Sequence, residues 1–332
     1  MSQQKLSWVG LIVEDSMIEA NLGEGSFSFI YGGRSLSSGS ATAFKLAKAR
    51  DLVERVSNSI PTVTNALSFF TGGTRDIRPD AEELLALQFA KIEAASDTAL
   101  VKVKKLSQQN GLCYYEMEHL AGVSFRQLVS EGKATLAHFA SLALMLDRLS
   151  SNKYFAYHGD LKPENIIVGP GSMKLIDPGY FGPLKCQEGM MSKVAITTTS
   201  YYPSLTPDDL YAFGIMLWEA CLGEHPLLSH GAEALNGTAC GDKLKQRVKR
   251  HSAIGYYGFE PLLNLRPPSA IHPGLAKPVE EFLLQALRLK IDEHGRLEDA
   301  DEEKNFADFA AIHSRITALQ AMDLDLLAKP KG

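Results

Sequence analysis

The stretch of this sequence with the most chemical potential is HGDLKPEN, residues 158–165. It places a histidine, a carboxylate, a lysine and an amide within eight positions, directly before the apolar run Ile-Ile-Val. An Asp-Pro-Gly triplet begins at Asp177, nineteen positions after His158. Charged and amide side chains at this density could carry out catalysis, although Asp and Asn are also common turn formers. The catalytic interpretation therefore needs further motifs elsewhere in the chain.

A second group of residues, nearer the start of the chain, suits the binding of phosphate. Gly23-x-Gly25 lies between two predicted strands, where the lack of a Cβ lets the backbone approach phosphate oxygens. Ser28 stands where a third glycine would complete this pattern. Strand alternation then points Ala43 and Lys45 to the same face. Since a lysine on an interior face is unusual without an anionic partner, the sequence predicts an anion beside Lys45.

The elements that must position these residues divide the chain into two parts. A β-rich part over 1–118 contains predicted strands and a predicted Asn110-Gly111 hairpin turn; the strands are 6–15, 27–33, 41–47, 101–106 and 112–120. Within it, the irregular stretch 46–80 is interpreted as an insertion, and Asp80 as the N-cap of a helix over 81–94. A larger helical part over 119–320 precedes a tail over 321–332, and its predicted helices are 125–132, 136–150, 208–223 and 277–290.

The composition limits the classes of function. The 34 Lys and Arg residues against 39 Asp and Glu give a net charge of −5, which argues against a nucleic-acid-binding protein. The first residues lack the pattern of a signal peptide, and the most apolar windows are short and interrupted by acidic residues, so we expect no membrane partner. The four cysteines are scattered without metal-ligand spacing. These features predict a cytoplasmic protein with free thiols.

In combination, the motifs resemble those of the protein kinase family. HGDLKPEN matches the family's HRDLKPEN at seven of eight positions, and the order and spacing of the motifs agree over about residues 10–230. The matching segments are 23–30, 43–45, the helix at 81–93, 158–165, 177–179 and 209–214. The resemblance implies an α+β, bilobal fold, with a small antiparallel β-sheet lobe carrying one main helix and a larger, mostly α-helical lobe. It also implies transfer of the γ-phosphate of ATP, with Mg²⁺, to Ser or Thr hydroxyls of a protein substrate.

The resemblance also implies roles for individual residues. Asp160 would orient the acceptor hydroxyl, and Lys162 would contact the γ-phosphate. Asn165 and Asp177 would hold magnesium, a cation that hard oxygen ligands suit. Lys45 would contact the α- and β-phosphates and pair with a helix carboxylate.

The remaining expected site residues bind the nucleotide. Glu83 is the expected carboxylate partner of Lys45, with Glu82 as the alternative, because the insertion makes the count ambiguous. Met117 would lie at the back of the adenine pocket or serve only as core. The backbones of Glu118 and Leu120 would form the adenine hinge, and Ile176 would add an apolar wall. The full set of expected nucleotide-binding residues is Gly23, Gly25, Ser28, Ile30, Ala43, Lys45, Glu83, Met117, Glu118 and Leu120.

Three departures from the family pattern concern regulation. Gly159 replaces the arginine that clamps a phosphorylated loop in many kinases, so we expect activity without loop phosphorylation. Pro178 replaces a phenylalanine, and its fixed φ is incompatible with a flipping ring. No glutamate follows Pro203, so the ion pair that usually anchors this region is expected to be absent, and the sequence does not identify its replacement.

Two other functions compete with an active Ser/Thr protein kinase. A small-molecule phosphotransferase of the same superfold would explain Gly159, but it fits the Lys-Pro-Glu at 162–164 poorly. A nucleotide-binding pseudokinase or scaffold would normally lack Lys45, Asp160 or Asp177, and this chain keeps all three. The 46–80 insertion is a candidate site for a regulatory partner.

Overall fold

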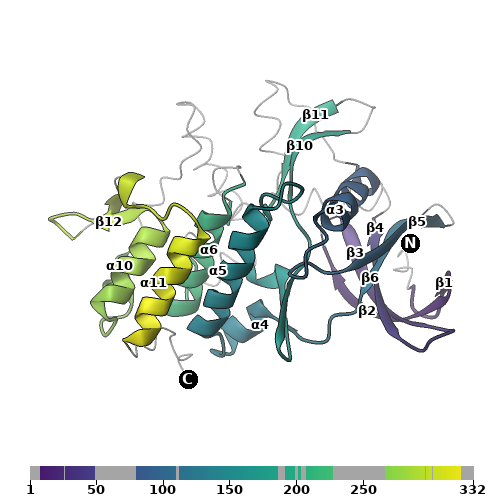
Figure 1. Ribbon diagram of the computed structural model, residues 1–332, viewed down its shortest axis with the longest axis horizontal. Coiled ribbons are helices and arrows are strands. Elements are labelled where there is room, and N and C mark those ends of the chain that lie inside the picture. Colours follow the sequence, from purple (N-terminus) through teal and green to yellow (C-terminus); the bar gives the residue numbers. More distant parts are fainter. Residues whose placement is uncertain are drawn as a thin grey trace, which may run out of the picture.

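The computed structural model describes residues 8–25, 27–48, 80–109, 112–185, 191–198, 201–202, 207–226, 266–295, 297–300 and 302–322. Within these ranges, an antiparallel sheet with one helix against it lies at one end of the molecule and a group of helices lies at the other (Figure 1). This arrangement confirms the predicted α+β, bilobal fold. Most of the predicted insertion, 49–79, lies outside the described residues.

The sheet has six strands in the order β1-β2-β3-β4-β6-β5, and each neighbouring pair is antiparallel. Its strands are β1 (Ile12–Val13), β2 (Ser16–Glu24), β3 (Ser28–Ser35), β4 (Ala41–Ala47), β5 (Val103–Gln109) and β6 (Leu112–Glu118). The expected strand over 6–15 is wrong in extent, because the chain turns at Glu14-Asp15, where Glu14 has a φ of 51°. The predicted turn at Asn110-Gly111 lies outside the described residues.

Helix α3 (Ala81–Ala95) packs against the sheet and begins where the sequence predicted. The Asp80 side chain accepts hydrogen bonds from the backbone N–H groups of Glu82 and Glu83, which confirms the N-cap. Leu85 and Phe89 on its buried stripe face the core, and the Phe89 ring lies 5.8 Å from that of Tyr115 on β6.

The second part is mainly helical. Its helices are α4 (Phe125–Ser130), α5 (Leu136–Ser150), η1 (Pro163–Asn165), α6 (Asp209–Leu222), α9 (Pro268–Ile271), α10 (Lys277–Ala286), η3 (Glu302–Lys304) and α11 (Phe309–Ala321). Its small sheets comprise β7 (Val123–Ser124), β8 (Ile166–Gly169), β9 (Ser172–Leu175), β10 (Tyr180–Lys185), β11 (Met191–Ile196), β12 (Leu289–Ile291) and β13 (Leu297–Asp299). The predicted helix over 277–290 ends earlier than expected, because Arg288 takes a φ of 59° and the chain enters β12.

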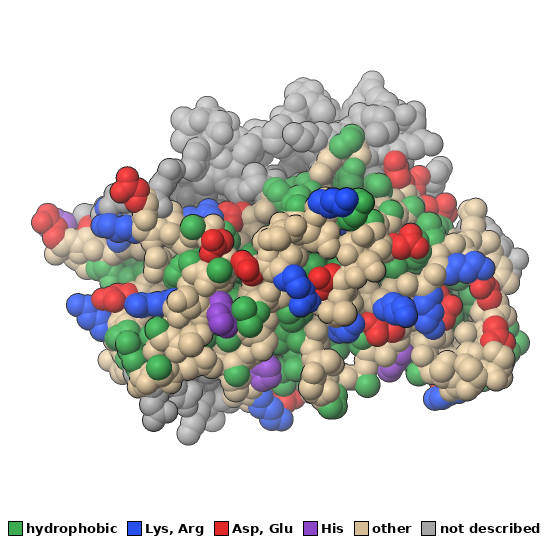
Figure 2. All heavy atoms as spheres, in the orientation of Figure 1, with side chains coloured by type: hydrophobic (Ala, Val, Ile, Leu, Met, Phe, Trp, Pro, Cys, Tyr) green, Lys and Arg blue, Asp and Glu red, His purple; other side chains and the backbone are tan. Residues whose placement is uncertain are grey.

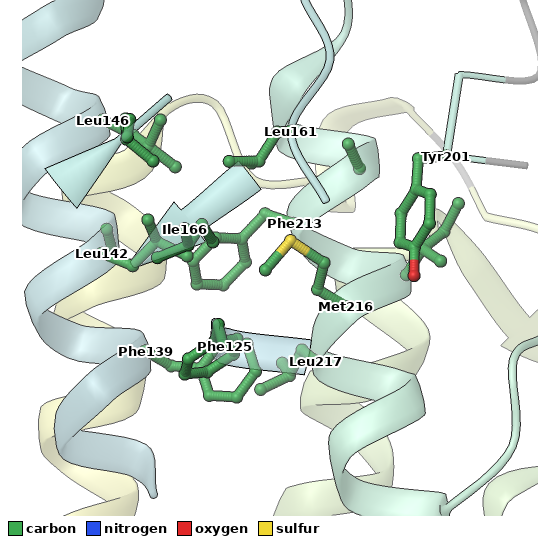
Figure 3. Close-up of a cluster of buried hydrophobic side chains, with 14 of the residues drawn as sticks. Phe125, Phe139, Leu142, Leu146, Leu161, Ile166, Tyr201, Phe213, Met216 and Leu217 are labelled. Atoms are coloured by element: carbon green, nitrogen blue, oxygen red, sulfur yellow. The ribbon is translucent and has the colours of Figure 1, made fainter. Parts of the chain in front are cut away.

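A cluster of aromatic and aliphatic side chains supports the segment that carries HGDLKPEN (Figure 3). The rings of Phe125, Phe139 and Phe213 meet edge to face, with centroids 5.2 and 5.5 Å apart. Leu161 and Ile166, on either side of η1, are fully buried in the same core. The apolar residues of the motif therefore fix its polar residues in space.

The surface carries no dominant charge on the face in view. Figure 2 shows Lys and Arg side chains interspersed with Asp and Glu. In the described part of the chain, no helix is both long enough and apolar enough to cross a membrane. Cys113 and Cys221 are free thiols.

Candidate active site

The glycine-containing turn between β2 and β3 borders a cleft between the sheet and the helical part. Gly23 pairs with Ile30 across the two strands, and the Gly25 N–H donates to the Ser28 carbonyl at 2.8 Å. Gly25 and Ser28 both line the cleft. Neither glycine has a positive φ, and a Cβ would meet nothing closer than 3.6 Å at either position. The fold itself therefore does not demand these glycines, whereas the approach of a ligand would.

Lys45 reaches the same cleft from the middle of the sheet. On β4, Lys45 pairs with Ile30 of β3 and with Tyr115 of β6, and only 3% of its surface is exposed. The ammonium nitrogen Nζ lies 2.7 Å from Asp177 Oδ1. The predicted anion beside Lys45 is thus a carboxylate from the distant Asp-Pro-Gly triplet.

On α3, the structure shows Gln88 in contact with Lys45, a residue that the sequence did not indicate, while a role for Glu83 or Glu82 beside Lys45 remains a prediction. Lys45 Nζ donates to Gln88 Oε1 at 2.8 Å. Glu82 and Glu83 lie in the first turn of α3, beside the cap, and Glu82 is exposed. Gln88 lies more than a turn further along, on the buried face of the helix, and is therefore the residue that points to Lys45.

The HGD segment is held by buried polar groups on its far side from the cleft. The backbone N–H groups of His158 and Gly159 donate to Asp209 Oδ2 and Oδ1, at 2.5 and 2.9 Å. His158 Nδ1 accepts from the Asp160 N–H, so Nε2 carries the hydrogen that it donates to the Ile176 carbonyl. Burial lowers the pKa of His158, which keeps the ring neutral and suits this pair of contacts.

The Asp160 carboxylate faces the cleft with a defined set of donors. Its Oδ1 accepts from the Thr198 N–H at 2.6 Å, and its Oδ2 accepts from Asn165 Nδ2 at 3.0 Å. Lys162 Nζ lies 3.3 Å from Oδ2 and donates to the Thr198 hydroxyl at 2.8 Å. The structure thus brings Asp160, Lys162 and Asn165 together at one end of the cleft.

The two expected magnesium ligands are adjacent, and their chemistry fits that cation. Asn165 Nδ2 also donates to the carbonyls of Asp160 and Asp177, which leaves its amide oxygen as an acceptor. Asp177 contributes a carboxylate that is partly exposed. No cluster of three or more His, Cys, Asp or Glu side chains suited to a metal occurs in the described ranges. One carboxylate and one amide suit Mg²⁺ that takes its other ligands from phosphate and water.

Among the expected adenine-binding residues, Ala43 lies on β4, Met117 and Glu118 lie on β6, and Leu120 follows β6. Ala43 on β4 pairs with Met117 on β6, and both are buried. The Glu118 N–H donates to the Lys102 carbonyl at 2.9 Å, and Leu120 packs against the main core. Their roles toward a nucleotide remain predictions.

Gly159 has a conformational reason that the sequence did not suggest. Its φ is +80°, and a Cβ there would lie 3.0 Å from the Phe181 ring. The backbone of Gly179 passes so close that a Cβ on Gly179 would lie 2.3 Å from the Gly159 carbonyl oxygen. Any side chain at 159, including the arginine of the family, would therefore be strained by the positive φ and would crowd the rings of Phe181 and Tyr157.

Two tyrosines anchor the region where the usual glutamate is missing. The Tyr202 hydroxyl accepts from the Leu161 N–H at 2.7 Å and donates to Asp209 at 2.5 Å. The Tyr201 hydroxyl donates to Glu219 at 2.7 Å and accepts from Arg126 at 2.6 Å. These contacts tie the two tyrosines to α4, to α6 and to the HGDLKPEN segment. Burial raises the pKa of both phenols well above the usual value.

Four structural contributors were missed in the sequence, namely Gln88, Tyr202, Lys48 and the role of Asp209. Lys48 is buried, and its Nζ lies 2.7 Å from Glu24 at the end of β2. Asp209 was visible as part of DLYAFG, and the two tyrosines as TTTSYYPSL, but neither pattern shows its long-range partner. Only the two tyrosines could have been suspected from the sequence, because they come just before the place where the usual glutamate is missing.

Known proteins with related sequences are serine/threonine kinases. The chain is 24% identical over 289 residues to the serine/threonine-protein kinase TIO of Arabidopsis thaliana, covering 81% of this chain and 20% of that protein. It is 25% identical over 255 residues to the serine/threonine-protein kinase PknB of Mycobacterium tuberculosis, covering 71% and 36%. It is 31% identical over 144 residues to the probable serine/threonine-protein kinase pknA2 of Bifidobacterium longum, covering 38% and 18%. The chain thus spans well under half the length of these relatives. No protein-family model matches it.

Proposed function

We propose that this chain, which is similar in sequence to serine/threonine-protein kinases, transfers the γ-phosphate of Mg-ATP to Ser or Thr hydroxyls of a protein. The observation that carries the proposal is the convergence of Lys45, Asp160, Lys162, Asn165 and Asp177 on one cleft. These residues come from the sheet, the HGDLKPEN segment and the Asp-Pro-Gly triplet. Phosphoryl transfer needs this combination of cations, metal ligands and an acceptor-orienting carboxylate.

Asp160 orients the acceptor in this proposal. Donors from Thr198, Asn165 and Lys162 fix the carboxylate, so an incoming hydroxyl would meet an oxygen that is already in place. The acceptor oxygen bonds to the γ-phosphorus as the bond to the departing ADP oxygen breaks. The hydroxyl proton passes to Asp160 or to solvent.

Lys45, Lys162 and the metal ligands handle the charge of the nucleotide. Lys45 binds the α- and β-phosphates from the sheet side, and Lys162 approaches the γ-phosphate from the side of Asp160. Asn165 and Asp177 would hold Mg²⁺, which would neutralise phosphate charge when bound. A protein substrate and an ATP cofactor follow from this proposal, and a cytoplasmic location remains a prediction.

Replacing Asp160 with Asn tests the proposal. We expect labelled phosphate transfer from ATP to generic acceptor proteins to fall by at least about 100-fold, because the amide removes the charge that orients the hydroxyl. Mg-ATP should still raise the melting temperature of this variant, since binding to the folded state stabilises it. Asp147→Asn, at a half-buried position of α5 that does not line the cleft, is the matched control.

The same assay separates the competing functions. Wild-type protein that binds Mg-ATP but labels only a small molecule would be a small-molecule phosphotransferase. Wild-type protein that binds Mg-ATP and transfers nothing would be a pseudokinase. Turnover by Asp160→Asn close to that of the wild type would rule out the role given to Asp160.

A further inference from the structure

One amide side chain joins the three segments that meet above the cleft. Gln88 Oε1 accepts from Lys45 Nζ at 2.8 Å, and Gln88 Nε2 donates to the Pro178 carbonyl at 2.7 Å. Lys45 in turn contacts Asp177, which is covalently linked to Pro178. The four residues form a closed ring of contacts between β4, α3 and the Asp-Pro-Gly triplet.

The chemistry at position 88 requires both an acceptor and a donor. A carboxylate could accept from Lys45, but it has no hydrogen to give to the Pro178 carbonyl. At 2.7 Å, two oxygen acceptors would instead repel each other. A glutamate would also place a second carboxylate on the ammonium group that pairs with Asp177. Glutamine satisfies both contacts and leaves Asp177 as the carboxylate partner of Lys45.

The opposite side of the triplet is fixed by the HGD segment. The Gly179 N–H donates to the His158 carbonyl at 2.9 Å, and a Cβ on Gly179 would lie 2.7 Å from the Ile196 carbonyl oxygen. The triplet is therefore attached to the HGD segment on one side and to Gln88 on the other. Asp177, which directly precedes these two attachments in the chain, has a φ of 53°, which is a costly conformation for a non-glycine residue.

We propose that Gln88 is a positioning residue for phosphoryl transfer, whose amide holds Lys45 and the Asp-Pro-Gly triplet in fixed positions relative to each other. The effect on kinetics that this inference predicts rests on the proposed function. Its structural consequence is that both halves of the amide are needed, so glutamate at 88 cannot replace glutamine.

Two substitutions separate the halves of the amide. Gln88→Glu keeps an acceptor for Lys45 and loses the donor to Pro178, whereas Gln88→Met keeps the length and loses both. We expect kcat/KM for Mg-ATP to fall about tenfold or more in each variant, with kcat falling at saturating nucleotide, because the lost hydrogen bond is buried. Helix α3 should stay in place, since its apolar stripe and Lys91, whose Nζ lies 4.2 Å from the centroid of the Tyr157 ring, do not depend on Gln88.

Hydrogen exchange provides a readout that does not depend on activity. The Gly179 amide should exchange at least about tenfold faster in both Gln88 variants, because the triplet loses one of its attachments. Gln108→Glu and Gln108→Met, on the exposed surface of β5, are the matched controls and should leave exchange and kinetics unchanged.

The outcomes distinguish this inference from the proposed function. Unchanged exchange at Gly179 in Gln88→Glu would overturn the inference, whatever the activity. Wild-type kinetics in Gln88→Glu with a loss only in Gln88→Met would also overturn it, since the contact with Lys45 alone would then suffice. A wild-type protein without transfer activity would refute the proposed function, and faster exchange in both variants would still support the structural role of Gln88.

Discussion

At the scale of single residues, the HGD segment depends on backbone geometry as much as on side chains. Gly159 is a clear case, because its positive φ and its contact with Phe181 both exclude a Cβ. In the sequence, Gly159 is notable for the missing arginine of the family, which concerns regulation. The structure adds a conformational reason that is independent of any phosphate.

Substitution of Gly159 tests that conformational reason. Gly159→Ala should lower the free energy of unfolding by about 1–3 kcal/mol, because alanine is strained at this φ and its Cβ would crowd two aromatic rings. Urea denaturation measures the loss. Gly274→Ala is the control, since its φ is not positive and its nearest neighbour to a Cβ lies at 3.8 Å. Equal stability of the two alanine variants would contradict the explanation.

At the scale of elements, the chain beyond β11 is tied to α6 and to the HGDLKPEN segment through hydroxyl groups. Tyr202 bridges Leu161 and Asp209, and Asp209 in turn holds the backbone of His158. The first turn of α6 therefore sets the position of the HGD segment. A change at Tyr202 should reach Asp160, because Leu161 follows Asp160 directly.

The variant Tyr202→Phe isolates this hydroxyl. We expect a loss of about 1–3 kcal/mol in the free energy of unfolding, because the buried Leu161 N–H would lose its acceptor. Turnover should also fall more than the loss of stability alone explains at a temperature where the variant is folded. Tyr154→Phe, which removes an exposed hydroxyl, should change neither quantity. Unaltered turnover in Tyr202→Phe would show that the link from Leu161 through Tyr202 to Asp209 does not support the HGD segment.

At the scale of the whole molecule, the site exists only where the two parts meet. Lys45 comes from the sheet, Gln88 from α3 and Asp177 from the helical part, across as many as 132 positions of sequence. The residues within HGDLKPEN could be selected from the sequence because their spacing is local and the apolar residues between them are buried together. Gln88 could not, since nothing local shows which face of α3 meets Lys45, and the 46–80 insertion makes the count from Lys45 to the helix ambiguous.

The two parts of the fold were predictable for a related reason. Alternation in 27–33 and 41–47 and helical periodicity in 136–150 and 208–223 are local signals, and they correspond to β3, β4, α5 and α6. The ends of elements were less predictable. They depend on single residues at positive φ, such as Glu14 and Arg288. The polar side chains of these residues give no sign in the sequence that the backbone takes this conformation.

The buried phenols have a consequence for the behaviour of the protein in alkali. Burial raises the pKa of Tyr115, Tyr201 and Tyr202 well above the usual 10.0. Because the folded state keeps these groups protonated, their contribution to stability is complete below pH 10 and is lost as the pH rises further. Near-ultraviolet titration should therefore show phenolate absorbance in two phases, an early one from exposed tyrosines and a later, cooperative one that coincides with unfolding. Tyr202→Phe should reduce the amplitude of the later phase, and a single smooth phase centred near pH 10 would show that these hydroxyls are open to solvent.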